Sequence, residues 1–243
     1  MVVVGNFRAG RSSDSGATLE DPRVVIVDML ALPAGGLVLA EFDDVAAERW
    51  DRVGYDLPNA SASAEAADGL DAADAAMMID NGWSLHVAGT LSKADGESCV
   101  RGDPGACAPA TTIRFDWGLA AGTAFDDCAP PSGDAGFAVP SGGTVPVKPT
   151  VHGDHWFFTN ITQGAEITER RAQWIVDSDL DQDGEVTLDE LRMIKAAEVF
   201  PIDLYNLAGA SIPIDTAYDY LEAQARTLGD FQGEGECPTR RKL

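Results

Sequence analysis

Hydrophobic and polar residues alternate over much of the chain before residue 160. In residues 111–117, the side chains of Ile113, Phe115 and Trp117 would share one face of an extended chain, with polar residues between them. Because successive side chains of a β-strand point to opposite faces, this period predicts half-buried antiparallel strands. The same pattern, bounded by Gly, Pro, Asp or Ser, occurs at residues 22–30, 36–42, 49–57, 82–91, 111–117, 135–140 and 144–151. These segments predict an antiparallel β-sandwich-like domain over residues 1–160.

The periodicity becomes helical after residue 160. Apolar residues recur at helical spacing in residues 165–178 and 188–200, and again in the stretch that begins at Asp215. Asp215 is a candidate N-cap for that last helix, and Gly229 is a candidate C-terminal stop.

A low-complexity stretch at residues 59–80 interrupts the predicted strands, and its second half predicts one short acidic helix. The fold class expected is therefore mainly β with α. We expect the β-sandwich-like domain to be followed by a helical segment over residues 161–243 that packs on it.

Charge restricts the partners of this protein. The formal net charge is −23 at pH 7, with an isoelectric point near 4.2. Nucleic acids and anionic membrane surfaces would be repelled by such a chain. No stretch of eighteen apolar residues occurs, so we expect no transmembrane segment.

Residues 179–190, DLDQDGEVTLDE, place acidic side chains at alternate positions around one glycine. Acidic residues that are merely exposed to solvent do not require this fixed spacing of carboxylates and glycine. Moving the frame back to Asp177 would put Gln182 at the glycine position, so only one register fits. The segment resembles the calcium-binding loop of the EF-hand family, and the predicted helices on both sides extend this resemblance.

The resemblance implies a set of oxygen ligands for calcium. These are Asp179, Asp181, Asp183, the backbone carbonyl of Glu185, Thr187 directly or through a water, and Glu190 through both carboxylate oxygens. Gly184 would form the sharp turn, and Val186 would anchor the loop to a core. EF-hands usually occur in pairs, but the chain has one such loop. A structural calcium site is therefore expected in place of a calcium-driven switch.

Four cysteines, at positions 99, 107, 128 and 237, show no CxxC spacing typical of a zinc site. Of the three pairings that are open, we favour Cys99 with Cys107 and Cys128 with Cys237. Disulfides would indicate an extracellular, cell-surface or periplasmic protein, whereas four reduced, buried thiols would indicate a cytosolic one. No signal peptide is visible at the start of the chain, so export implies that such a signal has been removed.

Histidine and aspartate are clustered in the segment VHGDHWFF. His152, Asp154 and His155, with His86 from a predicted strand, are a candidate second metal site for copper or zinc. The alternative is that these side chains hydrogen-bond the turn between the two predicted domains. The segment has no recognised metal-ligand spacing, unlike HExxH.

Two functions remain open. The first is an exported, non-enzymatic calcium-binding protein in which the ion supports a β domain that binds a partner or a surface. The combination of features is similar to that of exported bacterial proteins that join a β domain to an EF-hand, a resemblance that implies no activity. The second is a transition-metal protein or metalloenzyme that uses the histidine cluster. No nucleophile, phosphate-binding or dinucleotide motif favours catalysis.

Overall fold

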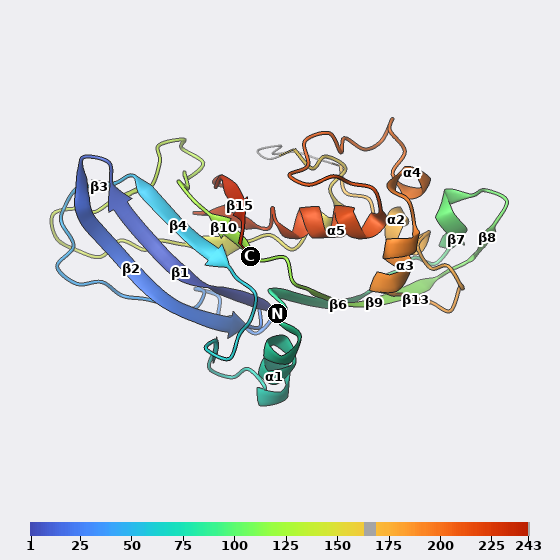
Figure 1. The fold of residues 1–243 in the computed structure, drawn as a ribbon, viewed down its shortest axis with the longest axis horizontal. Helices are drawn as coiled ribbons and strands as arrows, with labels where there is room; N and C mark the ends of the chain where they lie inside the picture. The colour runs from blue at the N-terminus through green and yellow to red at the C-terminus, as the bar shows by residue number, and fades with distance from the viewer. Residues whose placement is uncertain (163–168, 243) are drawn as a thin grey trace. The chain divides into compact units, whose positions relative to one another are not determined.

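The computed structural model describes residues 1–162 and 169–242 (Figure 1). The chain forms two compact units, and each is built from separated segments. Unit 1 contains residues 1–85, 118–152 and 228–243, and unit 2 contains residues 86–117 and 153–227. The fold is mainly β with a smaller α content, as predicted.

The first unit is centred on an antiparallel sheet. Five of its strands follow the order β2-β1-β4-β10-β15. Their bounds are β1 Val2–Arg11, β2 Asp14–Val27, β4 Arg52–Leu57, β10 Thr123–Phe125 and β15 Thr239–Arg241. Strands β1 and β2 form a long hairpin, drawn in blue in Figure 1. The short strands that complete the unit are β3 Arg49–Trp50 with β11 Phe137–Ala138, β12 Pro149–Val151 with β14 Gly229–Phe231, and β5 Glu65–Ala66 on β2.

The predicted acidic helix is present as α1 Ala72–Asn81. The carboxylate of Asp71 accepts a hydrogen bond from the backbone N–H of Ala73, and Gly82 ends the helix in the left-handed conformation. Met78 turns inward to pack with Val3 and Ile26 of the sheet. One face of the helix is therefore buried, and its acidic residues stay in solvent.

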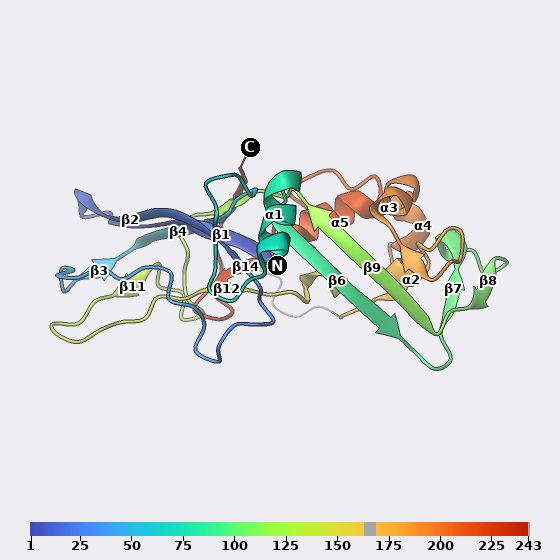
Figure 2. The same ribbon diagram turned by 90° about the horizontal axis from the view of Figure 1, so that it is seen from below.

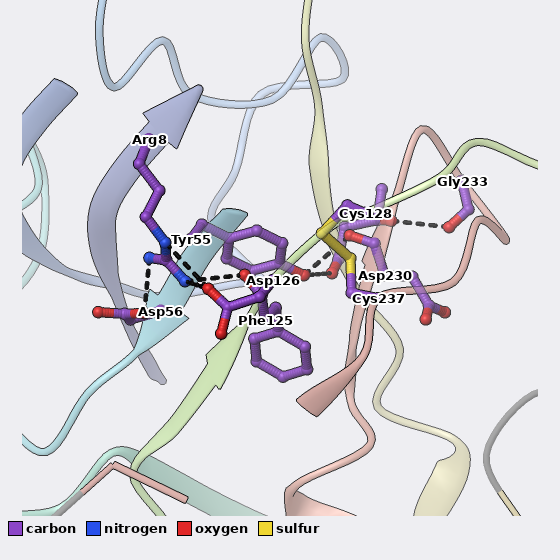
Figure 3. The surroundings of a disulfide bond; sticks show 10 residues. Arg8, Tyr55, Asp56, Phe125, Asp126, Cys128, Asp230, Gly233 and Cys237 are labelled. Carbon is purple, nitrogen blue, oxygen red and sulfur yellow. Dashed lines mark hydrogen bonds and ion pairs between the residues drawn. A yellow bond between two sulfur atoms is a disulfide. The ribbon is translucent and has the colours of Figure 1, made fainter. Parts of the chain in front are cut away.

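Both favoured cysteine pairings are confirmed. Cys99 is bonded to Cys107 in unit 2, and Cys128 is bonded to Cys237 in unit 1. Figure 3 shows the second disulfide, which fixes the C-terminal tail to the segment that follows β10. Closing a loop of this length, with a sequence separation of 109, contributes about 4 to 5 kcal/mol in the chain-entropy model.

The second unit combines β-strands with short helices. Strand β9 Thr112–Leu119 lies between β6 Leu85–Ser92 and β13 Glu185–Val186. Figure 2 shows β6 and β9 side by side in green. The alternation predicted for β9 is confirmed, because Ile113, Phe115 and Trp117 are buried and the residues between them are not. The other elements are β7 Glu97–Cys99, η1 Val100–Gly102, β8 Cys107–Pro109, η2 His155–Phe157, α2 Gln173–Val176, α3 Leu188–Met193, α4 Ala196–Val199 and α5 Ala217–Ala225.

Aromatic side chains fill the core of unit 2 beside α2. Trp174 stacks on Trp117 and packs against Phe200 and Tyr220, with ring centroids 5.2 to 6.2 Å apart. The hydroxyl of Tyr220 donates to the backbone carbonyl of Phe158. Aromatic pairs at these distances stabilise a core beyond the area they bury.

Three expectations are corrected. Residues 36–42 form no strand. The compact units do not follow the expected division into residues 1–160 and 161–243, because β9 pairs with β13 and because Cys237 is bonded to Cys128. The helix expected from Asp215 has Thr216 as its N-cap and ends at Ala225, with Arg226 as its C-cap, before Gly229 begins β14.

Candidate metal centre

The acidic loop at residues 179–190 is held at its middle by strand β9. Strand β13, which is part of the loop, pairs in parallel with β9, with Val186 opposite Phe115. Val186 is fully buried, and its backbone carbonyl accepts a hydrogen bond of 2.7 Å from the indole N–H of Trp117. The backbone N–H of Arg114 also donates to the carbonyl of Gly184 at 2.9 Å. The lone loop is therefore braced by the sheet of its own unit.

The turn of the loop depends on Gly184. Its φ of 87° lies in the left-handed region, where a side chain would be strained. This turn directs the backbone N–H groups of Asp183 and Gly184 at the carboxylate of Asp179, at 3.1 and 3.0 Å. Hydrogen bonds from the loop backbone therefore fix the carboxylate of Asp179, the first acidic residue of the loop.

Three carboxylates converge within the loop. Asp179, Asp181 and Glu190 each have one oxygen within 4.8 Å of the other two. Asp179 is 2% exposed and Glu190 is 8% exposed, whereas Asp181 is open to solvent. Glu190 is held by the backbone N–H groups of Leu180 and Thr187, at 2.9 and 2.8 Å from its two oxygens.

This cluster of negative charge has no basic partner among the residues that the structure describes. Arg114 pairs with Glu185 and Arg192 pairs with Asp189, two loop residues outside the group of three converging carboxylates. Burial raises the pKa of Asp179; hydrogen bonds from Gly184 and Asp183 oppose this effect, and the neighbouring Glu190 and Asp183 carboxylates add to it. Buried carboxylates are normally paired with a cation or coordinate a metal. The loop thus offers the hard oxygen donors that a divalent cation requires.

The remaining loop residues predicted as ligands have the following partners. The carboxylate of Asp183 accepts a hydrogen bond from the backbone N–H of Glu185 at 2.8 Å. The hydroxyl of Thr187 donates to Glu190 and accepts from its backbone N–H, which makes Thr187 the N-cap of α3. Their part in binding calcium, and that of the Glu185 carbonyl, stays a prediction.

The helix expected before the loop is much shorter than predicted. Part of the expected segment, including Ile167, lies outside the described residues. Residues 169–172 lie outside the helix: the backbone of Arg170 pairs with that of Phe158, and the N–H of Arg171 donates to the carbonyl of Phe157. Among the described residues of the segment, the four of α2 are the helical ones.

The helix expected after the loop is broken. Ile194 has φ −94° and ψ 124°, so α3 stops there and α4 starts separately. The extended residues pair with the N-terminus of α5: Lys195 bridges Thr216, and the N–H of Ala217 donates to the carbonyl of Ile194 at 3.0 Å. The long helix pair typical of an EF-hand is therefore not observed.

The four residues of the predicted second metal site are divided between the units. His86, Asp154 and His155 belong to unit 2, and His152 belongs to unit 1. His86 Nε2 lies 2.6 Å from a carboxylate oxygen of Asp116, and His155 Nδ1 lies 2.9 Å from the hydroxyl of Thr227.

The other two residues of that cluster have their own partners. Asp154 pairs with Arg170; burial alone would raise the pKa of Asp154, but the hydrogen bonds from Arg170 lower it below its ordinary value. His152 Nε2 lies 3.1 Å from the carbonyl of Gly233 and 3.4 Å from Asp230, both in unit 1. The second metal site stays a prediction.

Two supports of the loop were not predicted from the sequence. One is Asp177, a buried carboxylate just before the loop that accepts a hydrogen bond from the backbone N–H of Cys99 at 2.8 Å. The other is the hairpin that carries Cys99. The favoured pairing of Cys99 with Cys107 was the signal for this region in the sequence, and nothing in it indicated a contact with the loop some 75 residues later.

Comparison with protein-family models, with curated proteins and with solved structures finds no match to this chain. Among the described residues, the helices lack the length and apolar character needed to cross a membrane.

Proposed function

We propose that this is an exported, non-enzymatic protein that binds one calcium ion in residues 179–190. The observation that supports this proposal is the convergence of Asp179, Asp181 and Glu190, two of them buried, with no basic partner among the described residues. Such a cluster repels itself unless a cation neutralises it.

Calcium suits the donor set better than a transition metal does. The converging groups are all carboxylates, and calcium prefers hard oxygen ligands. Zinc and copper sites are usually built from imidazole or thiolate, and residues 179–190 contain neither His nor Cys. The loop order, with glycine at its sixth position and Glu190 at its twelfth, also matches the EF-hand pattern.

The role proposed for the ion is structural. Neutralising the loop would hold α2, α3 and β13 together, while β13 is already paired with β9. The β domain, with the predicted sandwich-like arrangement, would bind a protein partner or a surface. Nucleic acid is not the proposed partner. Two disulfides support an oxidising location outside the cytoplasm.

Calorimetric titration of the full chain with calcium tests the assignment. We expect one site per chain in the native protein, and loss of high-affinity binding in Asp181→Asn, Asp179→Ala and Glu190→Gln. Asp181→Asn is the most informative variant, because this side chain is exposed and contributes little to the stability of the fold. Asp189→Asn is the matched control, since Asp189 lies in the loop but is exposed and pairs with Arg192.

Unchanged calcium binding in Asp181→Asn and Glu190→Gln would reject the site. Stoichiometric copper or zinc in metal analysis of the native protein, lost on His152→Ala, would instead favour the alternative transition-metal function.

A further inference from the structure

A disulfide-closed hairpin in unit 2 contacts the chain on both sides of the acidic loop. Strands β7 and β8 pair with Cys99 opposite Cys107, and the bond between these two residues closes the hairpin. Figure 2 shows the hairpin beside α2, α3 and α4, and hydrogen bonds from Ser98 and Arg101 make these contacts. The function proposed above assigns no role to this hairpin.

The hairpin holds the chain where it enters the loop. The backbone N–H of Cys99 donates to the carboxylate of Asp177 at 2.8 Å, and the N–H of Arg101 donates to the carbonyl of Asp177 at 3.0 Å. The hydroxyl of Ser98 donates to the carbonyl of Val176 at 2.8 Å. These bonds fix the backbone immediately before Asp179, the first ligand.

The same hairpin holds the chain where it leaves the loop. The guanidinium of Arg101 donates to the carbonyl of Met193 at 3.1 Å and to the carboxylate of Glu198 at 2.6 Å. Gly102 packs so closely that a Cβ there would lie 2.4 Å from the backbone oxygen of Glu198. Arg101 itself has a φ of 55°, a conformation that the closed hairpin must maintain. One short segment thus joins both ends of the loop.

The two disulfides differ in access. Cys107 is exposed, whereas Cys128 and Cys237 are 0% and 2% exposed. A dithiol reductant therefore reaches the sulfur of Cys107 first.

We propose that the Cys99–Cys107 disulfide is a redox-sensitive clamp that sets the calcium affinity of residues 179–190. The proposal rests on the calcium-binding function above. A thiolate of the dithiol attacks Cys107 Sγ, the S–S bond breaks, and the Cys99 thiolate leaves and takes up a proton. The second thiol of the reductant then displaces Cys107 as a thiol and closes a cyclic disulfide, so two electrons pass from the dithiol to the protein.

Opening the clamp lowers calcium affinity because of conformational entropy. The open hairpin no longer keeps Asp177 and Met193 in place, so calcium must order both ends of the loop on binding. Coupling between two sites of this kind changes affinity by roughly fivefold to 150-fold. We expect a weakening on the order of tenfold.

The experiment measures calcium binding to the full chain by calorimetry before and after mild treatment with dithiothreitol. Alkylation and mass spectrometry verify that Cys99 and Cys107 are reduced while Cys128 and Cys237 stay bonded. The expected result is a calcium Kd about tenfold higher after reduction, restored on reoxidation. The Cys99→Ser/Cys107→Ser variant should show the weakened affinity and no response to dithiothreitol.

An unchanged Kd after verified opening of this disulfide would overturn the clamp. Absence of calcium binding in the oxidised protein would instead reject the proposed function, so the two failures are distinct. If the double variant does not fold, the reversible treatment of the native chain decides. The variant Arg101→Ala keeps the disulfide but removes the contacts with Met193 and Glu198, and it should weaken calcium binding without making it insensitive to the reductant.

Discussion

Individual carboxylates of this acidic chain have opposite protonation behaviour because their neighbours differ. Asp179 is buried beside other carboxylates, and burial raises its pKa. For Asp126, burial also acts to raise the pKa, but hydrogen bonds from Arg8 and Arg240 outweigh it and lower the pKa below its ordinary value. Figure 3 shows Arg8 between Asp56 and Asp126. The same residue type thus belongs to one candidate cation site and to one internal ion-pair network.

The Asp126 network predicts a pH-dependent stability. Because the folded-state pKa of Asp126 is lowered, its contribution is present above the unfolded value of about 3.9 and is lost as the pH falls through the folded-state pKa. Asp126→Asn should lower the free energy of unfolding by about 1 kcal/mol at neutral pH. The difference from the native protein should shrink towards about pH 3 and below.

Urea unfolding at several pH values tests this, with Asp134→Asn, an exposed carboxylate, as the control. A difference between Asp126→Asn and the native protein that persists unchanged in acid would show that the network is not the source of the effect.

Short elements of unit 2 are defined by their ends more than by their length. Helix α5 starts with a capping box in which Thr216 accepts from the N–H of Asp219 at 3.2 Å and Asp219 accepts from the N–H of Thr216 at 2.8 Å. The backbone of Thr216 also forms a β-bridge with Lys195 and thereby contributes to the break between α3 and α4. A cap on one helix is thus adjacent to the end of another.

Removing the cap should destabilise the protein without changing its fold. We expect Thr216→Ala to lower the free energy of unfolding by about 1 kcal/mol, because the N–H of Asp219 loses its acceptor. Thermal and urea unfolding provide the measurement. Thr216→Ser, which keeps the hydroxyl, is the control, and equal losses in both variants would mean that the hydroxyl does not stabilise the helix.

At the scale of the whole molecule, the chain contributes separated segments to each unit. Residues 86–117 belong with residues 153–227, and the C-terminal residues 228–243 belong with the N-terminal unit. The Cys128–Cys237 disulfide makes the latter assignment covalent. Since the acidic loop lies within unit 2, we expect the effect of an ion bound there to be confined to that unit.

Chelation of calcium should therefore loosen one part of the molecule. Calcium that binds only the native state adds about 2.7 kcal/mol of stability at 100-fold excess over Kd. Its removal should lower the melting temperature by several degrees and raise amide hydrogen exchange mainly between residues 173 and 200, where the loop and its flanks lie. Exchange in β1 and β4 should change little.

Hydrogen exchange followed by mass spectrometry, with and without a chelator, gives this map, and Asp181→Asn should not respond to the chelator. A uniform increase across both units would contradict the structural role of the ion and indicate a wider conformational change.

The sequence by itself determined features that depend on neighbouring residues. The alternation around Ile113, Phe115 and Trp117 predicted a strand correctly, because the side-chain period of two is a local property. The ordered carboxylates of residues 179–190 predicted a metal loop, and Asp179, Asp181 and Glu190 do converge, because the loop turn is specified by Gly184.

Only the tertiary structure decided features that depend on pairings between distant segments. The break at Ile194 arises from pairing with residues 215–217, although its local sequence favours a continuous helix. The support of Val186 by β9 and of Asp177 by the Cys99 hairpin joins residues about 70 to 80 positions apart. The periodicity of about a dozen residues does not predict which distant segment pairs with them. The packing and hydrogen bonds that stabilise such a pairing form only in the folded chain.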